Sequence, residues 1–132
     1  MSSVVADTHA AVWFRSEPQR LSMAATVALD EADANGKIFI SAITLVELCY
    51  LVEKGRIAAE VLQGIRDSLD DATTSFTLVS VDREVADTVE RVLRAEVPDM
   101  PDRIIAATAL YLSVPLVTRD GKIRASSVTT IW

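Results

Sequence analysis

The stretch SVVADTHAAVWF, residues 3–14, decides the fold. Residues 3–6 form a short run of small and β-branched side chains, which predicts a buried strand. Asp7 ends this run, and residues 8–14 then favour a helix. A strand that passes directly into a helix is the start of a βα unit, and repetition of such units predicts a parallel sheet covered by helices.

Further strands and helices alternate along the chain. The predicted strands are Lys37–Ile40, Phe76–Val81, Pro115–Thr118 and Ser127–Ile131. The predicted helices are a segment capped by Ser22 that runs to Ala34, Ala42–Lys54, Ala58–Ala72, a segment capped by Asp82 that runs to Ala95, and Asp102–Leu112. Most strands lack apolar alternation, as expected where helices cover both faces of a sheet. We expect a single α/β domain over residues 1–132.

Composition agrees with a folded domain. Half of the 132 residues are hydrophobic and 24% are charged, which is enough apolar material for a core. Cys49 is the single cysteine, so no internal disulfide is expected. Residues 1–14 lack the basic region of a signal peptide, and no stretch approaches the roughly 18 apolar residues that span a bilayer. We therefore expect a soluble, cytoplasmic protein without a membrane partner.

The net charge of −6 counts against simple nucleic-acid binding, which normally shows a basic surface. A function on RNA must therefore account for the acidity. We attribute much of it to a metal site and consider a basic protein partner as a second reason.

Four carboxylates stand at strand ends or early in the following helices: Asp7, Glu47, Asp102 and Asp120. Taken singly, Asp7 suits a helix cap, Asp102 a first helical turn and Asp120 a turn. Glu47 is harder to explain, because its helix is apolar almost all round and such helices are mostly buried. A buried carboxylate requires a partner or a cation.

In a doubly wound sheet these positions can converge beyond the carboxyl ends of the strands. Carboxylates that lie close together repel one another, and a divalent cation relieves the repulsion. Oxygen ligands without His or Cys favour Mg²⁺ or Mn²⁺, which can orient a phosphodiester and activate water. Asp82 also ends a strand, and we expect it to be only a cap if that strand lies at the sheet edge. Asp99 could supply a supporting oxygen.

The same segments resemble the PIN-domain family, especially the VapC-type toxins of toxin–antitoxin pairs. The matching segments are residues 4–9 (VVADTH), 41–48 (SAITLVEL), 101–109 (PDRIIAATA) and 116–120 (LVTRD). They occur in the family's order and extend the likeness over essentially the whole chain. One departure is residues 98–102 (PDMPD), where relatives often show Asp-Pro-Phe-Asp, and this leaves the role of Asp99 open.

The resemblance implies a three-layer α/β/α, Rossmann-like sheet of order 3-2-1-4-5. It also implies an endoribonuclease dependent on Mg²⁺ or Mn²⁺, whose acidic quartet maps onto Asp7, Glu47, Asp102 and Asp120, with Thr8 and Thr118 in support. Implied partners are an RNA substrate, a small antitoxin with a basic C-terminal tail, and a second copy of the chain in a homodimer. The predicted helices 42–54 and 58–72 could receive an antitoxin helix or simply cover the core.

Several residues and functions stay open at this level. Arg119 and Lys122 either contact RNA phosphates or belong to a solvated loop, and His9 is either a phosphate contact or a packing residue. Trp13 is more typical of a core or dimer contact than of a base-stacking platform. Two other functions are a receiver-like phosphoacceptor module, with Lys122 as its late lysine, and a PIN-like binding protein without catalysis.

Overall fold

The computed structural model describes residues 2–132; residue 1, which the predicted domain includes, lies outside them. Five parallel strands form one sheet in the order β3-β2-β1-β4-β5. The strands are β1 (Val4–Ala6), β2 (Ile38–Ser41), β3 (Phe76–Val79), β4 (Leu116–Val117) and β5 (Thr130–Ile131). The predicted α/β class and the implied strand order 3-2-1-4-5 are confirmed.

Helices connect the strands and cover the sheet. They are α1 (Thr8–Ser16), η1 (Pro18–Arg20), α2 (Met23–Asn35), α3 (Ala42–Glu53), α4 (Ala59–Asp70), α5 (Arg83–Thr88), η2 (Val89–Arg91), α6 (Met100–Leu112) and α7 (Gly121–Arg124). Ser22, Ser41 and Asp82 cap α2, α3 and α5, as predicted. None of these helices has the length and apolar character that crossing a bilayer requires, within residues 2–132.

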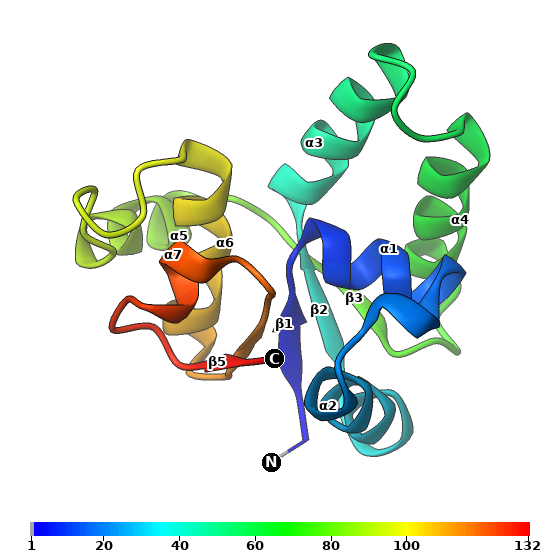
Figure 1. Cartoon of the computed structure of the whole chain (residues 1–132), viewed down its shortest axis with the longest axis horizontal. Coiled ribbons are helices and arrows are strands. Elements are labelled where there is room, and N and C mark those ends of the chain that lie inside the picture. Colours follow the sequence, from blue (N-terminus) through cyan, green and yellow to red (C-terminus); the bar gives the residue numbers. More distant parts are fainter. Residues whose placement is uncertain (1) are drawn as a thin grey trace.

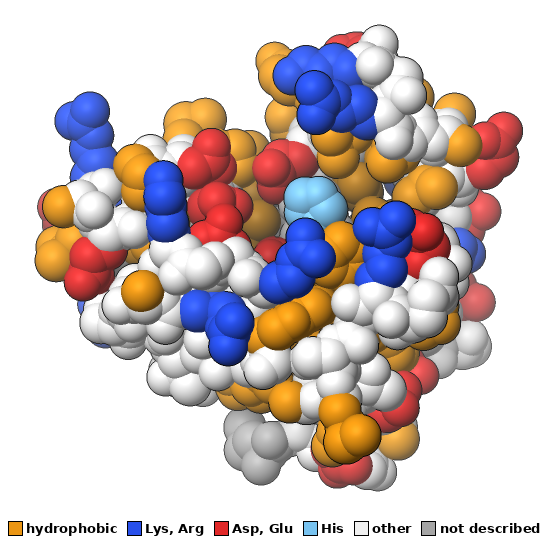
Figure 2. All heavy atoms as spheres, viewed as in Figure 1, with side chains coloured by type: hydrophobic (Ala, Val, Ile, Leu, Met, Phe, Trp, Pro, Cys, Tyr) orange, Lys and Arg blue, Asp and Glu red, His pale blue; other side chains and the backbone are white. Residues whose placement is uncertain are grey.

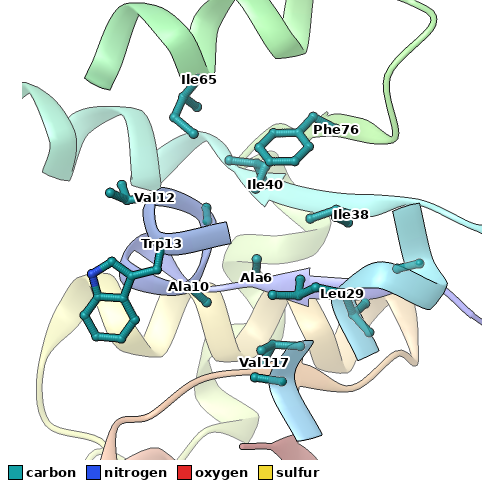
Figure 3. Packing of buried hydrophobic residues seen from close by; sticks show 14 of the residues in the cluster. Ala6, Ala10, Val12, Trp13, Leu29, Ile38, Ile40, Ile65, Phe76 and Val117 are labelled. Atoms are coloured by element: carbon teal, nitrogen blue, oxygen red, sulfur yellow. The ribbon is translucent and has the colours of Figure 1, made fainter. Parts of the chain in front are cut away.

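The core lies on both faces of the sheet. Alternate residues of β1 point to opposite faces, so Val4 and Ala6 join one apolar cluster while Val5 joins the other. Figure 3 shows the first cluster, where Ala10 of α1, Leu29 of α2 and Ile65 of α4 surround the sheet residues. The second cluster lies under α6 and α7, so the layers are helix, sheet and helix (Figure 1).

The helices α3 and α4 form a hairpin that rises beyond the carboxyl ends of the strands (Figure 1). Gly55 ends α3 with a φ of +71°, a conformation that favours glycine. The expectation that the apolar helix α3 is mostly buried is wrong, because much of the hairpin extends past the edge of the sheet and is not covered by it. Only Thr44 and Leu48 of α3 are fully buried, whereas Val46 and Tyr50 are 50% and 61% exposed.

Two helix boundaries differ from the prediction near the proline segment. The helix predicted to run to Ala95 ends with η2, where the Arg103 guanidinium donates to the carbonyls of Val89 and Val92 and so satisfies the helix end. The helix α6 begins at Met100 rather than Asp102, because Asp99 caps it and Pro101 fits its first turn. The short helix α7, which follows Asp120, was not predicted.

Candidate active site

A cavity of ≈ 340 Å³ opens beyond the carboxyl ends of β1 and β4, where the strand order reverses. Ligands bind at such switch points in open α/β sheets. The cavity is lined by Asp7, Thr8, His9, Trp13, Glu47, Asp99, Asp102, Arg119 and Asp120. It thus brings together all four predicted carboxylates, together with Asp99 and Thr8. Asp82 is absent from this lining, because β3 is an edge strand.

Asp7 lies at the centre of the site, at the end of β1. One of its oxygens, Oδ1, accepts the backbone N–H of Ala10 at 2.8 Å and caps α1. The other, Oδ2, accepts the Thr118 hydroxyl at 2.5 Å. Asp7 therefore acts as a helix cap and lines the cavity as well, so the two interpretations of this residue are compatible.

Glu47 reaches the cavity from the second turn of α3. Its Oε1 accepts the Thr8 hydroxyl at 2.6 Å. The Thr8 oxygen also lies 3.1 Å from the Thr44 hydroxyl, and because Thr8 already donates to Glu47, Thr44 must donate to Thr8. Thr44 was not among the predicted site residues, although it lies one helical turn before Glu47 on the same face of α3.

Asp120 lines the cavity from the start of α7. Its Oδ1 caps that helix by accepting the N–H groups of Lys122 and Ile123, each at 3.0 Å. Its own N–H donates to Thr118 Oγ1 at 3.0 Å. The buried Thr118 hydroxyl therefore links Asp7 and Asp120, which agrees with the supporting position that the resemblance implied.

Asp102 lies in the first turn of α6 and lines the same cavity as Glu47 and Asp120. Its N–H donates to the Asp99 carboxylate at 3.2 Å, so Asp99 caps the helix while also lining the cavity. Burial and repulsion from Asp99, Asp120, Glu47 and Asp7 raise the pKa of Asp102 to about 7. Repulsion that involves all four neighbours indicates that the carboxylates share one electrostatic environment.

Burial also raises the pKa of Asp7 and of Glu47. The hydrogen bonds from Thr118 and Thr8 act against this rise, because they stabilise the charged forms. The two ion pairs within residues 2–132, Arg20 with Glu17 and Arg83 with Asp87, do not involve the cavity carboxylates. No arginine within residues 2–132 therefore forms an ion pair with the cavity carboxylates, although Arg119 lines the same cavity.

The donor set fits a hard divalent cation, since it consists of carboxylate oxygens with threonine hydroxyls behind them. Within residues 2–132, no three acidic, His or Cys side chains stand close enough to form a ready-made metal group. Binding would thus draw the carboxylates together. Asp102, Asp7, Glu47 and Asp120 would hold the ion directly or through water, while Thr8 and Thr118 would orient two of them.

The basic and aromatic residues divide between neighbouring cavities. Arg119 lines the acidic cavity, whereas Lys122 lines an adjoining one with Asp99, Asp102 and Asp120. His9 is exposed at the cavity rim. Trp13 is a core residue, as expected, but its indole also reaches the cavity wall, which no sequence signal indicated.

Fold and cavity together define a Rossmann-like α/β domain with an acidic, cation-suited cleft at its topological switch point. The PIN domain family model matches residues 4–127. Over its full length the chain is 35% identical to Ribonuclease VapC22 of Mycobacterium tuberculosis, all of which the match also covers. This chain belongs to the PIN-domain family.

Solved structures support the same fold. The structure of VapBC2 from Rickettsia felis, bound to a promoter DNA fragment, matches 97% of this chain and 96% of its own with a TM-score of 0.71 at 18% identity. FitAcB from Neisseria gonorrhoeae matches 96% of this chain and 95% of its own with a TM-score of 0.62 at 24% identity. At these identities the likeness shows the architecture.

We predict that the metal-free protein loses stability as the pH rises from about 5 to about 8. Folding raises the pKa of Asp102 to about 7, so between its unfolded value and that pH the folded state binds more protons, and stability falls with rising pH. Asp102→Asn should therefore raise the melting temperature at pH 8 more than at pH 5. An equal rise in melting temperature for Asp70→Asn, which changes an exposed carboxylate, would contradict the conclusion that repulsion in the cavity destabilises the fold.

We predict that Thr118→Val weakens divalent-metal binding by about 10- to 100-fold, because Asp7 and the Asp120 backbone lose a shared hydroxyl. Thr118→Ser keeps the hydroxyl and should bind metal almost as the wild type does. Calorimetric titration with Mn²⁺ measures this directly. Equal Mn²⁺ affinities of the Val and Ser variants would show that the Thr118 hydroxyl does not support metal binding.

Proposed function

We propose that this chain is a metal-dependent endoribonuclease and the toxin of a VapBC-type toxin–antitoxin pair. The observation that carries the proposal is the meeting of four carboxylates, from four separate segments, in one cavity at the switch point. Ribonuclease VapC22 supports it as a full-length relative at 35% identity. RNA phosphodiesters are the substrate class, and Mg²⁺ or Mn²⁺ is the cofactor.

The chemistry is hydrolysis. A water oxygen forms a bond to phosphorus, one bond from phosphorus to a ribose oxygen breaks, and that leaving oxygen takes up a proton. A bound Mg²⁺ or Mn²⁺ would supply charge stabilisation and lower the pKa of the attacking water. Four carboxylates would hold this ion, directly or through water, and so keep the reacting groups in place: those of Asp7, Glu47, Asp102 and Asp120. The Thr8 and Thr118 hydroxyls fix the orientations of Glu47 and Asp7.

The receiver-like alternative needs a phosphoacceptor after the third strand, facing the site. Asp82 follows β3, but it caps α5 by accepting the N–H of Val85 and does not line the cavity. Membership in the PIN family also favours the nuclease. A PIN-like protein without catalysis is the outcome that the following experiment would reveal.

We predict that purified protein cleaves RNA in Mg²⁺ or Mn²⁺ and that EDTA abolishes the cleavage. Asp7→Asn and Asp102→Asn should each lower the rate by at least about 100-fold, because each removes a charged ligand from the shared site. The matched control is Asp82→Asn, which changes a strand-end cap outside the cavity. Cleavage that survives both EDTA and Asp7→Asn would reject the mechanism.

The antitoxin is the proposed protein partner. The solved neighbours include a toxin–antitoxin complex from Klebsiella pneumoniae and the VapBC2 and FitAB structures. A groove between α3 and α4 has an apolar floor of Cys49, Val52 and Leu62 and is also lined by charged and polar side chains, and α3 further exposes Val46 and Tyr50. An amphipathic antitoxin helix would bury this apolar face. A basic C-terminal tail would suit the acidic cavity.

We predict that Val46→Glu prevents co-purification with the proposed antitoxin, because it places a charge on the exposed part of α3. Val27→Glu makes the same change on α2, where Val27 is 63% exposed, and should leave the complex intact. Co-expression followed by size-exclusion chromatography measures both. Light scattering on the toxin alone tests the homodimer, which stays a prediction from the family resemblance, as does the cytoplasmic location.

A further inference from the structure

A second cavity, of ≈ 350 Å³, adjoins the acidic one and shares Thr8, His9, Trp13 and Arg119 with it. Its lining adds Arg20, Arg56, the acidic Glu17 and three apolar residues, and we call it the arginine cavity. We propose that the arginine cavity binds the phosphate next to the scissile one in single-stranded RNA. This inference rests on the proposed ribonuclease function and adds to it the position of the flanking nucleotide.

Three distant segments supply the arginines. Arg20 ends η1, Arg56 lies in the turn between α3 and α4, and Arg119 follows β4. In Figure 2 most of the acidic side chains near the single histidine lie to its left, with one basic side chain beyond them, and Lys and Arg side chains lie below it, to its right and above it, with one acidic side chain beside the basic one on the right. An acidic site for a cation thus adjoins a basic site on one face of the molecule.

Trp13 organises this basic site. The Arg119 guanidinium lies 4.8 Å from the Trp13 ring centroid, and that of Arg20 lies 5.7 Å away. The rings of His9 and Trp132 lie 5.5 and 6.0 Å from it. A cation–π contact holds a guanidinium in place without using its N–H donors, which stay available for a ligand.

The charges of these arginines are largely unpaired within the part of the chain that the structure describes. Arg56 and Arg119 belong to neither of its two ion pairs, and Arg20 pairs only with Glu17 on its own loop, at 3.2 Å. Arg119 even lines the same cavity as the carboxylates without forming an ion pair with them. The guanidinium groups of Arg56 and Arg119, which form no ion pair in residues 2–132, suit an anionic ligand that bridges the two cavities.

The chemistry of that ligand follows from the neighbouring site. A strand whose scissile phosphate lies at the acidic cavity must pass its next phosphate to an adjoining surface, and planar guanidinium donors match phosphate oxygens. The cavity on the opposite side offers one cation, Lys122, beside three aspartates. The arginine cavity is therefore the better phosphate site of the two.

The test measures binding of a short, mixed-sequence single-stranded RNA to the whole protein in EDTA, so that cleavage plays no part. Trp13 and Trp132 are the only two tryptophans in the chain, so their intrinsic fluorescence reports on this cavity. We expect RNA to change this fluorescence. Arg20→Gln, Arg56→Gln and Arg119→Gln should each weaken binding on the order of tenfold, because each removes a charge-assisted contact.

The salt dependence separates a phosphate contact from a structural effect. Loss of one contact should lower the slope of log affinity against log salt by about 0.7 for a single strand. The matched control is Arg83→Gln, which removes the same charge from an exposed side chain paired with Asp87 outside both cavities. It should alter neither the affinity nor the slope.

Trp13 is a positioning residue, since it acts through the arginines. Trp13→Leu should weaken RNA binding and lower the salt slope, and Trp13→Phe should largely restore both. A loss of affinity at unchanged slope, or no recovery with Phe, would overturn this part of the proposal.

The remaining outcomes distinguish the two proposals. Three results would each overturn the proposed phosphate site, whatever the cleavage activity. They are a failure of the wild-type protein to bind RNA, binding of RNA without a change in fluorescence, and binding of RNA by the three Arg→Gln variants that is as tight as that of the wild type. Arginine-dependent binding without cleavage in Mg²⁺ or Mn²⁺ would instead support the cavity and reject the ribonuclease.

Discussion

Repulsion among carboxylates at one edge of the sheet is the constraint on which the site depends. The fold tolerates it by anchoring the acids separately, and it does not pair them with arginines. Asp7 is held by Thr118 and the start of α1, Glu47 by Thr8, and Asp120 by the start of α7. Asp102 has neighbours that only raise its pKa. Hydrogen bonds from Thr118 and Thr8 favour the charged forms of Asp7 and Glu47, whereas every neighbour that acts on Asp102 favours its protonated form.

The strand order determines which acids take part. Placing β1 beside β4 brings the loops after both strands to one point, and the covering helices α3 and α6 bring Glu47 and Asp102 to the same point. Asp82, like Asp7, follows a strand and caps the next helix, yet it does not line the cavity because β3 is at the edge. Identical local chemistry thus gives a structural cap in one place and a candidate ligand in the other.

The contrast between Asp7 and Asp82 shows which features of the fold and of the site could be predicted from the sequence. Strand ends, caps and the carboxylates were predictable because they depend on residues adjacent in the chain, and the edge position of β3 followed from the family resemblance. The exposure of α3 was not predictable, since it depends on how far the hairpin extends past the sheet. The same holds for Trp13, whose contacts with Arg20, Arg119 and Trp132 join segments far apart in sequence.

An acidic protein can still suit a polyanionic substrate if its charges are separated on one face. Net charge governs long-range approach, which here is unfavourable at −6. Screening limits that repulsion to about 8–10 Å at physiological salt, so the groups that line the cleft decide binding at contact. In the proposed complex the carboxylates would need a cation before phosphate could approach them, whereas the arginines beside Trp13 would attract phosphate directly. Binding of the metal and binding of RNA should therefore favour each other. The cation reduces the repulsion between the carboxylates and the phosphate, and the phosphate reduces the repulsion between the arginines and the cation.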